Sequence, residues 1–302
     1  MQLLISGGTG FIGTALVQAL TQQGHHIIVL TRGAPPAQPG VRFVNSLDAI
    51  EAREQIDAVV NLAGASLAAK RWTASYRREL LDSRLDTTRD LVALIGRLER
   101  TPPTLLSASA VGYYGHHGDE KLAEDATVNA CFSQQLCEQW EAQAQAASAH
   151  GTRVCLLRFG VVLDKGGGAL SEMTRSFRFG VGTWAGSGNQ WLSWVHRADL
   201  VRAVLFLLHN AGLAGPVNIT APAPVTARGL GEALCAHFTT LFRMGVPGPV
   251  MRLLLGQMAD ELLLNGQRVV PAVLEAAGFH FLYPQIDDAL AAIYGDQPSS
   301  ST

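Results

Sequence analysis

Short apolar runs alternate with stretches of helical apolar spacing through the first two-thirds of the chain. The apolar runs predict buried strands at residues 3–6, 27–30, 56–62, 104–108 and 153–163. Between them, the apolar spacing at 11–23, 76–98 and 133–149 indicates helices. Strands separated by helices of this length favour an α/β fold of the Rossmann type, with right-handed crossovers and a doubly wound parallel sheet.

The pattern changes after residue 163. Three glycines at 166–168 mark a break, and 179–194 is rich in glycine and tryptophan. Such a stretch suits either a substrate-facing loop or an irregular connection closed by core tryptophans. A helical pattern follows at 195–209, and 217–219 can return to the main sheet as a strand.

These changes suggest two units. We expect a nucleotide-binding domain at 1–165, which also receives 192–220, and a smaller, mainly helical substrate-side lobe made of 166–191 and 221–296. Residues 297–302 are rich in serine, and we expect them to form a disordered tail.

A glycine-rich loop joins the first strand to the first helix. Gly7 suits the tight turn, Gly10 a close approach of the backbone to a pyrophosphate, and Gly13 close helix packing. Unpaired amides and the positive end of the helix dipole favour an anion at such a helix start. We therefore predict that a dinucleotide contacts Gly7, Thr9, Gly10, Phe11, Ile12 and Gly13.

The residues at the end of the second strand help to decide whether NAD(H) or NADP(H) is bound. An NAD site usually has Asp or Glu about 20 residues after the glycine loop, to bind the ribose 2′-hydroxyl. This chain has Thr31 and Arg32 there, and no acidic residue precedes Asp48. Because a guanidinium can bind a 2′-phosphate in a fork, we predict NADP(H) bound by Thr31 and Arg32. The alternative is that Arg32 is a solvated loop residue.

Ligands of doubly wound sheets lie at the carboxyl ends of the strands. Three segments, 61–64, 107–109 and 158–160, fall at such ends in this chain. We expect them to face the nucleotide and to add the contacts Leu62, Ala63, Gly64, Ser107 and Arg158.

Charge and composition point to small-molecule chemistry. A net charge of −2 with only three lysines argues against a nucleic-acid partner. No apolar stretch approaches the length of a membrane span, and a core strand at the start of the chain argues against a signal peptide. The four cysteines form no C-x-x-C pair, as expected of a protein in the reducing cytoplasm.

Taken in order, residues 7–13, 61–64, 107–115, 158–161 and 194–199 resemble the motifs of extended short-chain dehydrogenases/reductases. The segments 70–72, 112–115, 166–168, 186–188 and 266–267 resemble epimerase family proteins of the YfcH type, which also carry an uncharacterised C-terminal domain, here at about 248–294. The resemblance implies a Rossmann-type fold that binds NADP(H), and an oxidoreductase or sugar-nucleotide epimerase ancestry with an unestablished substrate. It also implies a homodimer formed through the helices at 76–98 and 133–149.

The chain departs from that wider family at the acid/base pair. Short-chain dehydrogenases use Tyr-x-x-x-Lys, in which the lysine lowers the tyrosine pKa from about 10. Here Phe132 falls at the tyrosine position and Leu136 at the lysine position. None of the five tyrosines has a lysine four residues later, so the usual proton donor is missing.

The serine loop offers a substitute. Ser109 matches the family serine and can polarise a carbonyl, although a hydroxyl there can equally cap a strand end. Tyr113 or Tyr114 can supply the proton, slowly unless an arginine such as Arg158 lies close.

Further positions are expected on the substrate side. Lys70, Arg71 and Trp72 suit an anionic substrate group or, alternatively, a solvated charge pair beside a packed tryptophan. Trp194 and His196 lie where the family's substrate and main domains meet, although His196 also suits a structural hydrogen bond. We predict no metal site, because the adjacent histidines 116 and 117 have no cysteine pair or carboxylate cluster near them in sequence.

Two functions remain open. The first is an NADPH-dependent enzyme acting on a small polar substrate, with Ser109 orienting a carbonyl and an unusual proton donor. The second is a catalytically silent NADP(H)-binding sensor or assembly factor, which the loss of tyrosine and lysine favours. The retained serine loop favours the enzyme.

Overall fold

A seven-stranded parallel sheet forms the centre of the computed structural model, which describes residues 1–295. In spatial order the strands are β12 (Gly215–Ile219), β7 (Arg153–Phe159), β5 (Thr104–Ala110), β4 (Ala58–Asn61), β1 (Gln2–Ser6), β2 (His26–Leu30) and β3 (Val41–Val44). The chain runs outward from β1 to β3 and then from β4 to β12. The strand order therefore reverses between β1 and β4, as it does at the ligand site of doubly wound sheets, and the predicted fold class is confirmed.

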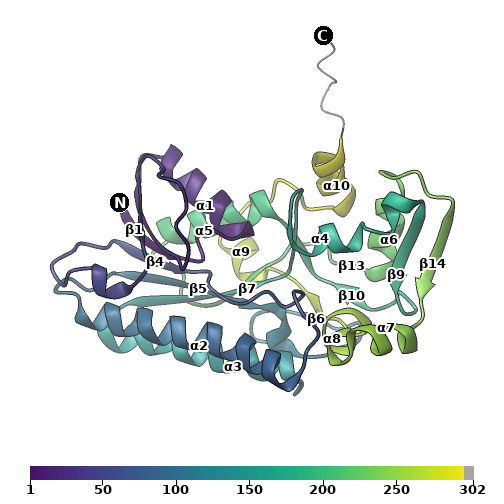
Figure 1. Cartoon of the computed structure of the whole chain (residues 1–302), viewed down its shortest axis with the longest axis horizontal. Coiled ribbons are helices and arrows are strands. Elements are labelled where there is room, and N and C mark those ends of the chain that lie inside the picture. The colour runs from purple at the N-terminus through teal and green to yellow at the C-terminus, as the bar shows by residue number, and fades with distance from the viewer. Residues whose placement is uncertain (296–302) are drawn as a thin grey trace, which may run out of the picture.

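Helices cover both faces of the sheet (Figure 1). One face carries α1 (Phe11–Gln22) and α5 (Arg197–His209), and the other carries α2 (Ala74–Arg97) and α3 (Phe132–Gln145). Successive side chains of β1 enter different cores: Leu3 and Ile5 pack with α1 and α5, and Leu4 packs with α2. This two-sided burial explains why the strands are almost wholly apolar.

Two predicted elements have other bounds in the structure, and one strand was missed. The predicted strand 153–163 is two strands, β7 and β8 (Val161–Leu163), because the chain turns at Gly160, where a Cβ would lie 2.7 Å from the Ser193 carbonyl oxygen. The helix predicted from 195 begins at Arg197, after the short strand β11 (Trp194–His196), which pairs with β8. The short edge strand β3, Val-Arg-Phe-Val, was not predicted. The return of 217–219 to the main sheet, as part of β12, is confirmed.

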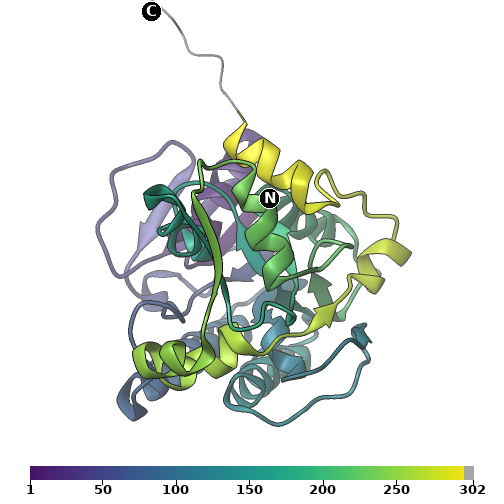
Figure 2. The same cartoon turned by 90° about the vertical axis from the view of Figure 1, so that its right-hand side faces the viewer.

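Most of the remaining segments gather at one end of the molecule, which faces the viewer in Figure 2, whereas α9 (Ala272–Ala276) packs against β12 of the main sheet. The other helices of these segments are α4 (Gly168–Met173), α6 (Ala227–Cys235), α7 (Gly248–Leu255), α8 (Gln257–Ala259) and α10 (Ile286–Tyr294). A π-helical turn at Asp260–Leu264 follows α8. The other strands are β6 (Lys121–Leu122), β9 (Val181–Ala185), β10 (Trp191–Leu192), β13 (Val225–Thr226), β14 (Phe242–Val246) and β15 (Arg268–Val269).

Pairing between these short strands ties distant segments together. β15 pairs with β6, and β14 pairs with β9, so the C-terminal residues contact the middle of the chain. The division into two domains stays a prediction, as does a dimer through α2 and α3, which pack against each other. No helix within residues 1–295 is both long and apolar enough to cross a membrane. The tail predicted at 297–302 lies outside the described residues.

Candidate functional site

The glycine loop between β1 and α1 is packed too closely for side chains. A Cβ on Gly13 would lie 2.1 Å from the Gly7 carbonyl oxygen. Gly7 has φ +71°, and its Cβ would meet the backbone of Leu62 at 2.6 Å. These contacts bring the loop against the end of β4, so only glycine fits at both positions.

The start of α1 is built to receive an anion. Its N-cap is Gly10, and no side chain within residues 1–295 caps the first turn. Thr9 and Gly10 are exposed, and Phe11 and Ile12 are partly exposed, so the start of this helix lies at the surface. Free amides at the positive end of a helix dipole fit a pyrophosphate, and the residues present therefore suit a dinucleotide.

Arg197 supports this loop, and the sequence reasoning missed it. Its Nη1 donates to the Phe11 carbonyl at 3.2 Å, and its Nε donates to Asp164 at 2.7 Å. The guanidinium also lies over the Phe11 ring, 4.7 Å from its centre. Arg197 thus joins the start of α1 to the segment before Gly166. Arg197 belongs to the 194–199 motif, but we considered only Trp194 and His196 of that motif as site residues.

The second strand ends beside the same loop. Its last residue pairs in register with Ser6, which precedes Gly7. Arg32 follows and is exposed, whereas Thr31 is buried and its hydroxyl accepts a bond from the Gly33 amide at 3.2 Å. The structure therefore leaves Arg32 available to a ligand at the carboxyl edge.

The ends of β4 and β5 also reach this edge. Leu62 and Ala63 are partly exposed, and Gly64 is exposed beside the Arg84 side chain. Ser107, in contrast, is buried and receives a hydrogen bond from Asn61 at 3.3 Å. Nucleotide contact from Leu62, Ala63 and Gly64 stays a prediction, and the geometry does not support one from Ser107.

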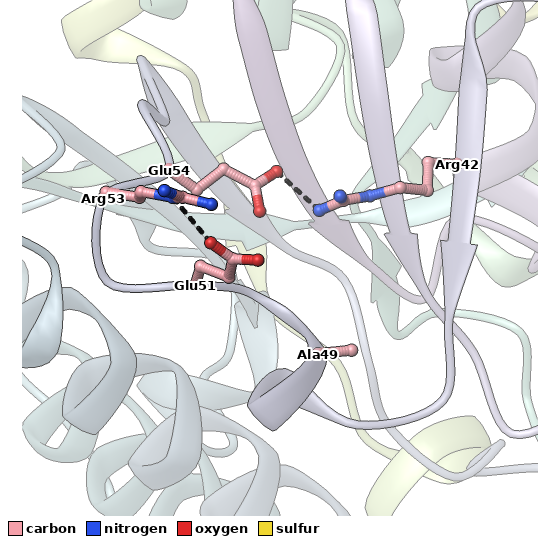
Figure 3. Close-up of a pocket in the computed structure, with 5 residues that line it drawn as sticks. All are labelled: Arg42, Ala49, Glu51, Arg53 and Glu54. Atoms are coloured by element: carbon pink, nitrogen blue, oxygen red, sulfur yellow. Dashed lines mark hydrogen bonds and ion pairs between the residues drawn. The ribbon is translucent and has the colours of Figure 1, made fainter.

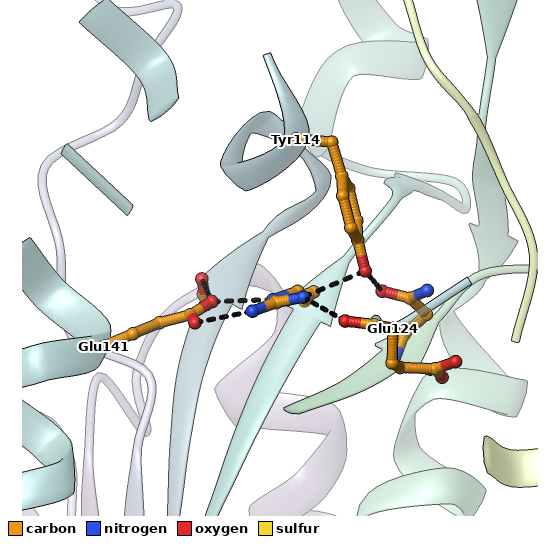
Figure 4. Close-up of polar contacts among 6 residues, drawn as sticks. Tyr114, Glu124 and Glu141 are labelled. Atoms are coloured by element: carbon orange, nitrogen blue, oxygen red, sulfur yellow. Dashed lines mark hydrogen bonds and ion pairs between the residues drawn. The ribbon is translucent and has the colours of Figure 1, made fainter. Parts of the chain in front are cut away.

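A buried polar network lies at the carboxyl ends of β5 and β7 (Figure 4). Arg158 donates from Nε and Nη2 to the two oxygens of Glu141, at 2.9 Å each. Its Nη1 donates to the Tyr114 hydroxyl and to the Glu124 carbonyl, both at 3.0 Å. Burial opposes the charge, but bonds to Glu141 and its charge raise the pKa of Arg158. Arg158 is thus a buried structural cation, which argues against the cofactor contact predicted for it.

The surroundings of Tyr114 argue against the proton-donor role predicted for it. It is 0% exposed, and its hydroxyl donates to Asn218 Oδ1 at 2.6 Å. Burial raises the pKa of Tyr114 to about 12. A phenol that is buried, bonded and weakly acidic is poorly placed to give a proton to a substrate.

Tyr113 and Ser109 have different surroundings. Tyr113 is half-buried, and the guanidinium carbon of Arg158 lies 3.5 Å from its ring centre. An arginine is therefore close, as the sequence argument required. Ser109 is buried and donates to Glu141 Oε1 at 2.6 Å, so its proton is already engaged. Glu141 was not predicted, because nothing in its local sequence distinguishes it from a solvated helix glutamate.

The start of α3 shows what replaces the family acid/base pair. Phe132 packs edge-on against Trp72, with ring centres 5.3 Å apart, and Leu136 is buried in the same apolar cluster. Trp72 is 6% exposed and donates to the Leu67 carbonyl at 2.8 Å. Trp72 is therefore a core residue, which corrects its predicted substrate role, while Lys70 and Arg71 are exposed.

Trp194 and His196 are also structural. Trp194 is 0% exposed and donates to the Ala223 carbonyl at 3.0 Å. His196 caps α5, because its Nδ1 accepts a bond from the Ala198 amide at 3.1 Å, and burial lowers its pKa. Their burial argues against the substrate contacts predicted for them.

A charged hollow elsewhere is lined by Arg42, Ala49, Glu51, Arg53 and Glu54 (Figure 3). Arg42 pairs with Glu54 and Arg53 with Glu51, so its charges are largely balanced. Glu54 also bonds to Gln2, which begins β1. The hollow therefore lies at the amino ends of the strands, away from the glycine loop.

Comparison with known proteins agrees with this geometry. Residues 3–220 match the model of the NAD dependent epimerase/dehydratase family, and residues 246–293 match a domain of unknown function (DUF1731). Epimerase family protein ML0860 of Mycobacterium leprae is 39% identical over 297 residues, which cover 95% of this chain and 94% of that protein.

Two solved structures are similar over nearly the whole chain. Human epimerase family protein SDR39U1 (isoform 2), solved with NADPH, superposes with a TM-score of 0.88 at 32% identity and covers 97% of this chain and 99% of its own. A nucleoside-diphosphate sugar epimerase from Corynebacterium glutamicum gives 0.79 at 32% identity, covering 98% of this chain and 58% of its own. The chain therefore belongs to the NAD dependent epimerase/dehydratase family and ends in a DUF1731 domain.

Proposed function

We propose that this chain binds NADP(H) and acts as an oxidoreductase or epimerase on a small polar substrate. The observation that carries the proposal is the uncapped start of α1 beside the close-packed glycines, with the exposed Arg32 after the neighbouring strand. The first feature fits a pyrophosphate and the second fits a 2′-phosphate. The NADPH in the human relative, which is 32% identical, supports the same choice.

For catalysis we propose Tyr113 as the group that moves the proton. It is the tyrosine of the serine loop that is not sealed in the core, and its ring is fixed under Arg158. The bound cofactor would supply the hydride. Ser109, which is buried and donates to Glu141, would act as a positioning residue that holds this carboxylate and, through it, Arg158 against Tyr113.

A silent NADP(H)-binding protein is the second candidate. Phe132 and Leu136 fill the family's acid/base positions with apolar packing, which cannot exchange a proton. A sensor or assembly factor requires the cofactor site and nothing more.

Cofactor affinity tests the binding proposal. We expect NADPH to bind more tightly than NADH. Arg32→Gln should weaken NADPH binding about 10- to 100-fold, because this is the contribution of a hydrogen bond to a charged group. NADH binding should change little. Arg53→Gln, an exposed arginine at the opposite strand ends, is the control. A preference for NADH in the unaltered protein would contradict the proposal.

Turnover separates the two candidates. Purified protein with NADPH is mixed with pools of small carbonyl compounds and sugar nucleotides. The consumption of NADPH and the isomerisation of the sugar nucleotides are then followed. Tyr113→Phe should abolish any turnover and leave NADPH affinity unchanged, whereas Tyr294→Phe, on α10, should keep it. Tight binding without turnover under every condition would favour the silent protein.

A further inference from the structure

Three potential metal ligands from distant parts of the chain meet outside the network around Arg158. His116 follows the serine loop, Cys131 precedes α3, and Glu261 lies in the π-helical turn of the C-terminal domain. One ligand atom of each lies within 4.8 Å of the other two. The prediction of no metal rested on the lack of a cysteine pair or a carboxylate cluster near His116, whereas the fold brings one cysteine and one carboxylate to this histidine.

The backbone around this cluster is held in place. Gly115, with φ +73°, turns the chain before His116, and its Cβ would collide with the Asn129 backbone. The Asn129 side chain then donates to the His116 carbonyl at 2.8 Å. His116 is thus fixed relative to the segment that leads into Cys131.

Glu261 is fixed to the same helix start. Cys131 is the N-cap of α3 but makes no capping bond, and Glu261 replaces that cap. Its oxygens accept bonds from the amides of Phe132 and Ser133, both at 3.1 Å, and from the Ser133 hydroxyl at 2.8 Å. These bonds fix the position of the carboxylate beside Cys131.

One atom of the cluster is left without a partner. His116 Nδ1 is buried and forms no hydrogen bond within the described part of the chain. A buried polar atom without a partner is costly, and a bound ion or water molecule is one of its ordinary explanations. His116 and Cys131 are only partly buried, so an ion and a water molecule can reach them.

The donor set selects the ion. Imidazole and thiolate suit Zn²⁺, whereas Mg²⁺ and Ca²⁺ prefer oxygen ligands alone. Zinc bonds of about 2.0–2.3 Å place tetrahedral ligands roughly 3.5 Å apart, so side chains within 4.8 Å need to close by about 1 Å. Gln257, the most distant donor to Glu261 at 3.3 Å, is the partner that an ion would displace most easily.

We propose that His116, Cys131 and Glu261 form a three-ligand site for Zn²⁺, with the fourth position open to water. Such an ion would tie the C-terminal domain to the start of α3, one residue before Phe132. Three protein ligands with an open position are the usual arrangement of an accessible zinc.

Cobalt is a suitable probe, because a thiolate bound to Co²⁺ absorbs in the near ultraviolet. The full chain is freed of metal with a chelator and titrated with Co²⁺, and Zn²⁺ is then added. We expect one equivalent to bind with a thiolate band, and Zn²⁺ to remove the band. Absence of the band in the unaltered protein would overturn the proposal.

Single substitutions test which side chains bind the ion. Cys131→Ser should abolish the thiolate band, and His116→Gln should weaken binding by at least about 100-fold, the upper range for groups that only support a ligand. Cys235→Ser, in a separate core, and His209→Gln, on exposed α5 surface, should leave the titration unchanged. Zn²⁺ should raise the melting temperature of the controls and not of Cys131→Ser. A band that persists in Cys131→Ser, or equal zinc stabilisation of all variants, would refute the assignment.

Discussion

Arg158 and Glu141 form a two-point ion pair inside the molecule, between β7 and α3. Both nitrogen–oxygen distances are 2.9 Å, and the side chains are 4% and 7% exposed. The same carboxylate accepts the Ser109 hydroxyl at 2.6 Å. One helix residue therefore holds the arginine beneath which Tyr113 lies and the serine of the adjacent strand.

Removing one charge of the Arg158–Glu141 pair should strongly destabilise the protein. Glu141→Gln leaves Arg158 charged in the core without its counterion, and we expect a loss of about 3–5 kcal/mol in the free energy of unfolding. Urea denaturation followed by circular dichroism measures it. The double variant Glu141→Leu/Arg158→Met should lose less free energy of unfolding than the sum of the losses in the single variants Glu141→Leu and Arg158→Met. Strict additivity would show that the pair is not coupled.

The adjacent tyrosines should differ in stability as well as in chemistry. Tyr114→Phe removes the donor to Asn218 Oδ1 and an acceptor of Arg158, leaving buried polar atoms unpaired. We expect a cost of about 1–3 kcal/mol in the free energy of unfolding. Tyr113→Phe should change it by less than about 0.5 kcal/mol, because its contact with Arg158 runs through the ring. Equal urea midpoints for the two variants would contradict this difference.

The sequence predicted the fold well because its signals are local. Apolar runs and helical spacing located most of the sheet, and the glycine spacing located the loop at its carboxyl edge. Strand β3 gives a weaker local signal, because it has only four residues with an exposed arginine among them, and its pairing with β2 identifies it as part of the sheet. The turn at Gly160 is likewise explained by a contact with Ser193, 33 positions away.

The polar site was harder to predict for the same reason. A tyrosine in a loop has no local mark that tells burial from access, so Tyr113 and Tyr114 were equivalent in sequence. Tyr114 is paired with Asn218, 104 residues later. Glu261 reaches Ser133 across 128 residues. Residue type and spacing name candidates, but only tertiary contacts show which of them are committed to the core.

Close packing in the glycine loop gives a third prediction. Gly13→Ala places a Cβ 2.1 Å from the Gly7 carbonyl oxygen, so the backbone must move. We expect a loss of about 1–3 kcal/mol in stability, together with weaker NADPH binding. Gly212→Ala is the matched control, because nothing lies within 4 Å of its Cβ. Urea denaturation and fluorescence titration with NADPH measure the two effects, and unchanged NADPH affinity in Gly13→Ala would separate this loop from the cofactor.

The cap of α5 gives a dependence of stability on pH. His196 accepts the Ala198 amide through Nδ1, so its neutral form is needed, and burial lowers its pKa below the usual value of about 6.5. The unfolded chain then binds a proton before the folded one. Stability should be complete above about pH 6.5 and decrease as the pH falls from there through the lower folded pKa.

Replacement of this histidine tests the origin of that loss. Asn is a good N-cap that does not titrate, so His196→Asn should lose less stability between about pH 7.5 and pH 5.5 than the unaltered protein. The contact of His196 with Tyr283, at 4.2 Å between ring centres, contributes at both pH values and does not produce this difference. His209→Gln, an exposed histidine on the same helix, should keep the full dependence. Urea midpoints at the two pH values decide the matter, because an equal decrease in His196→Asn and in the unaltered protein would place the titrating group elsewhere.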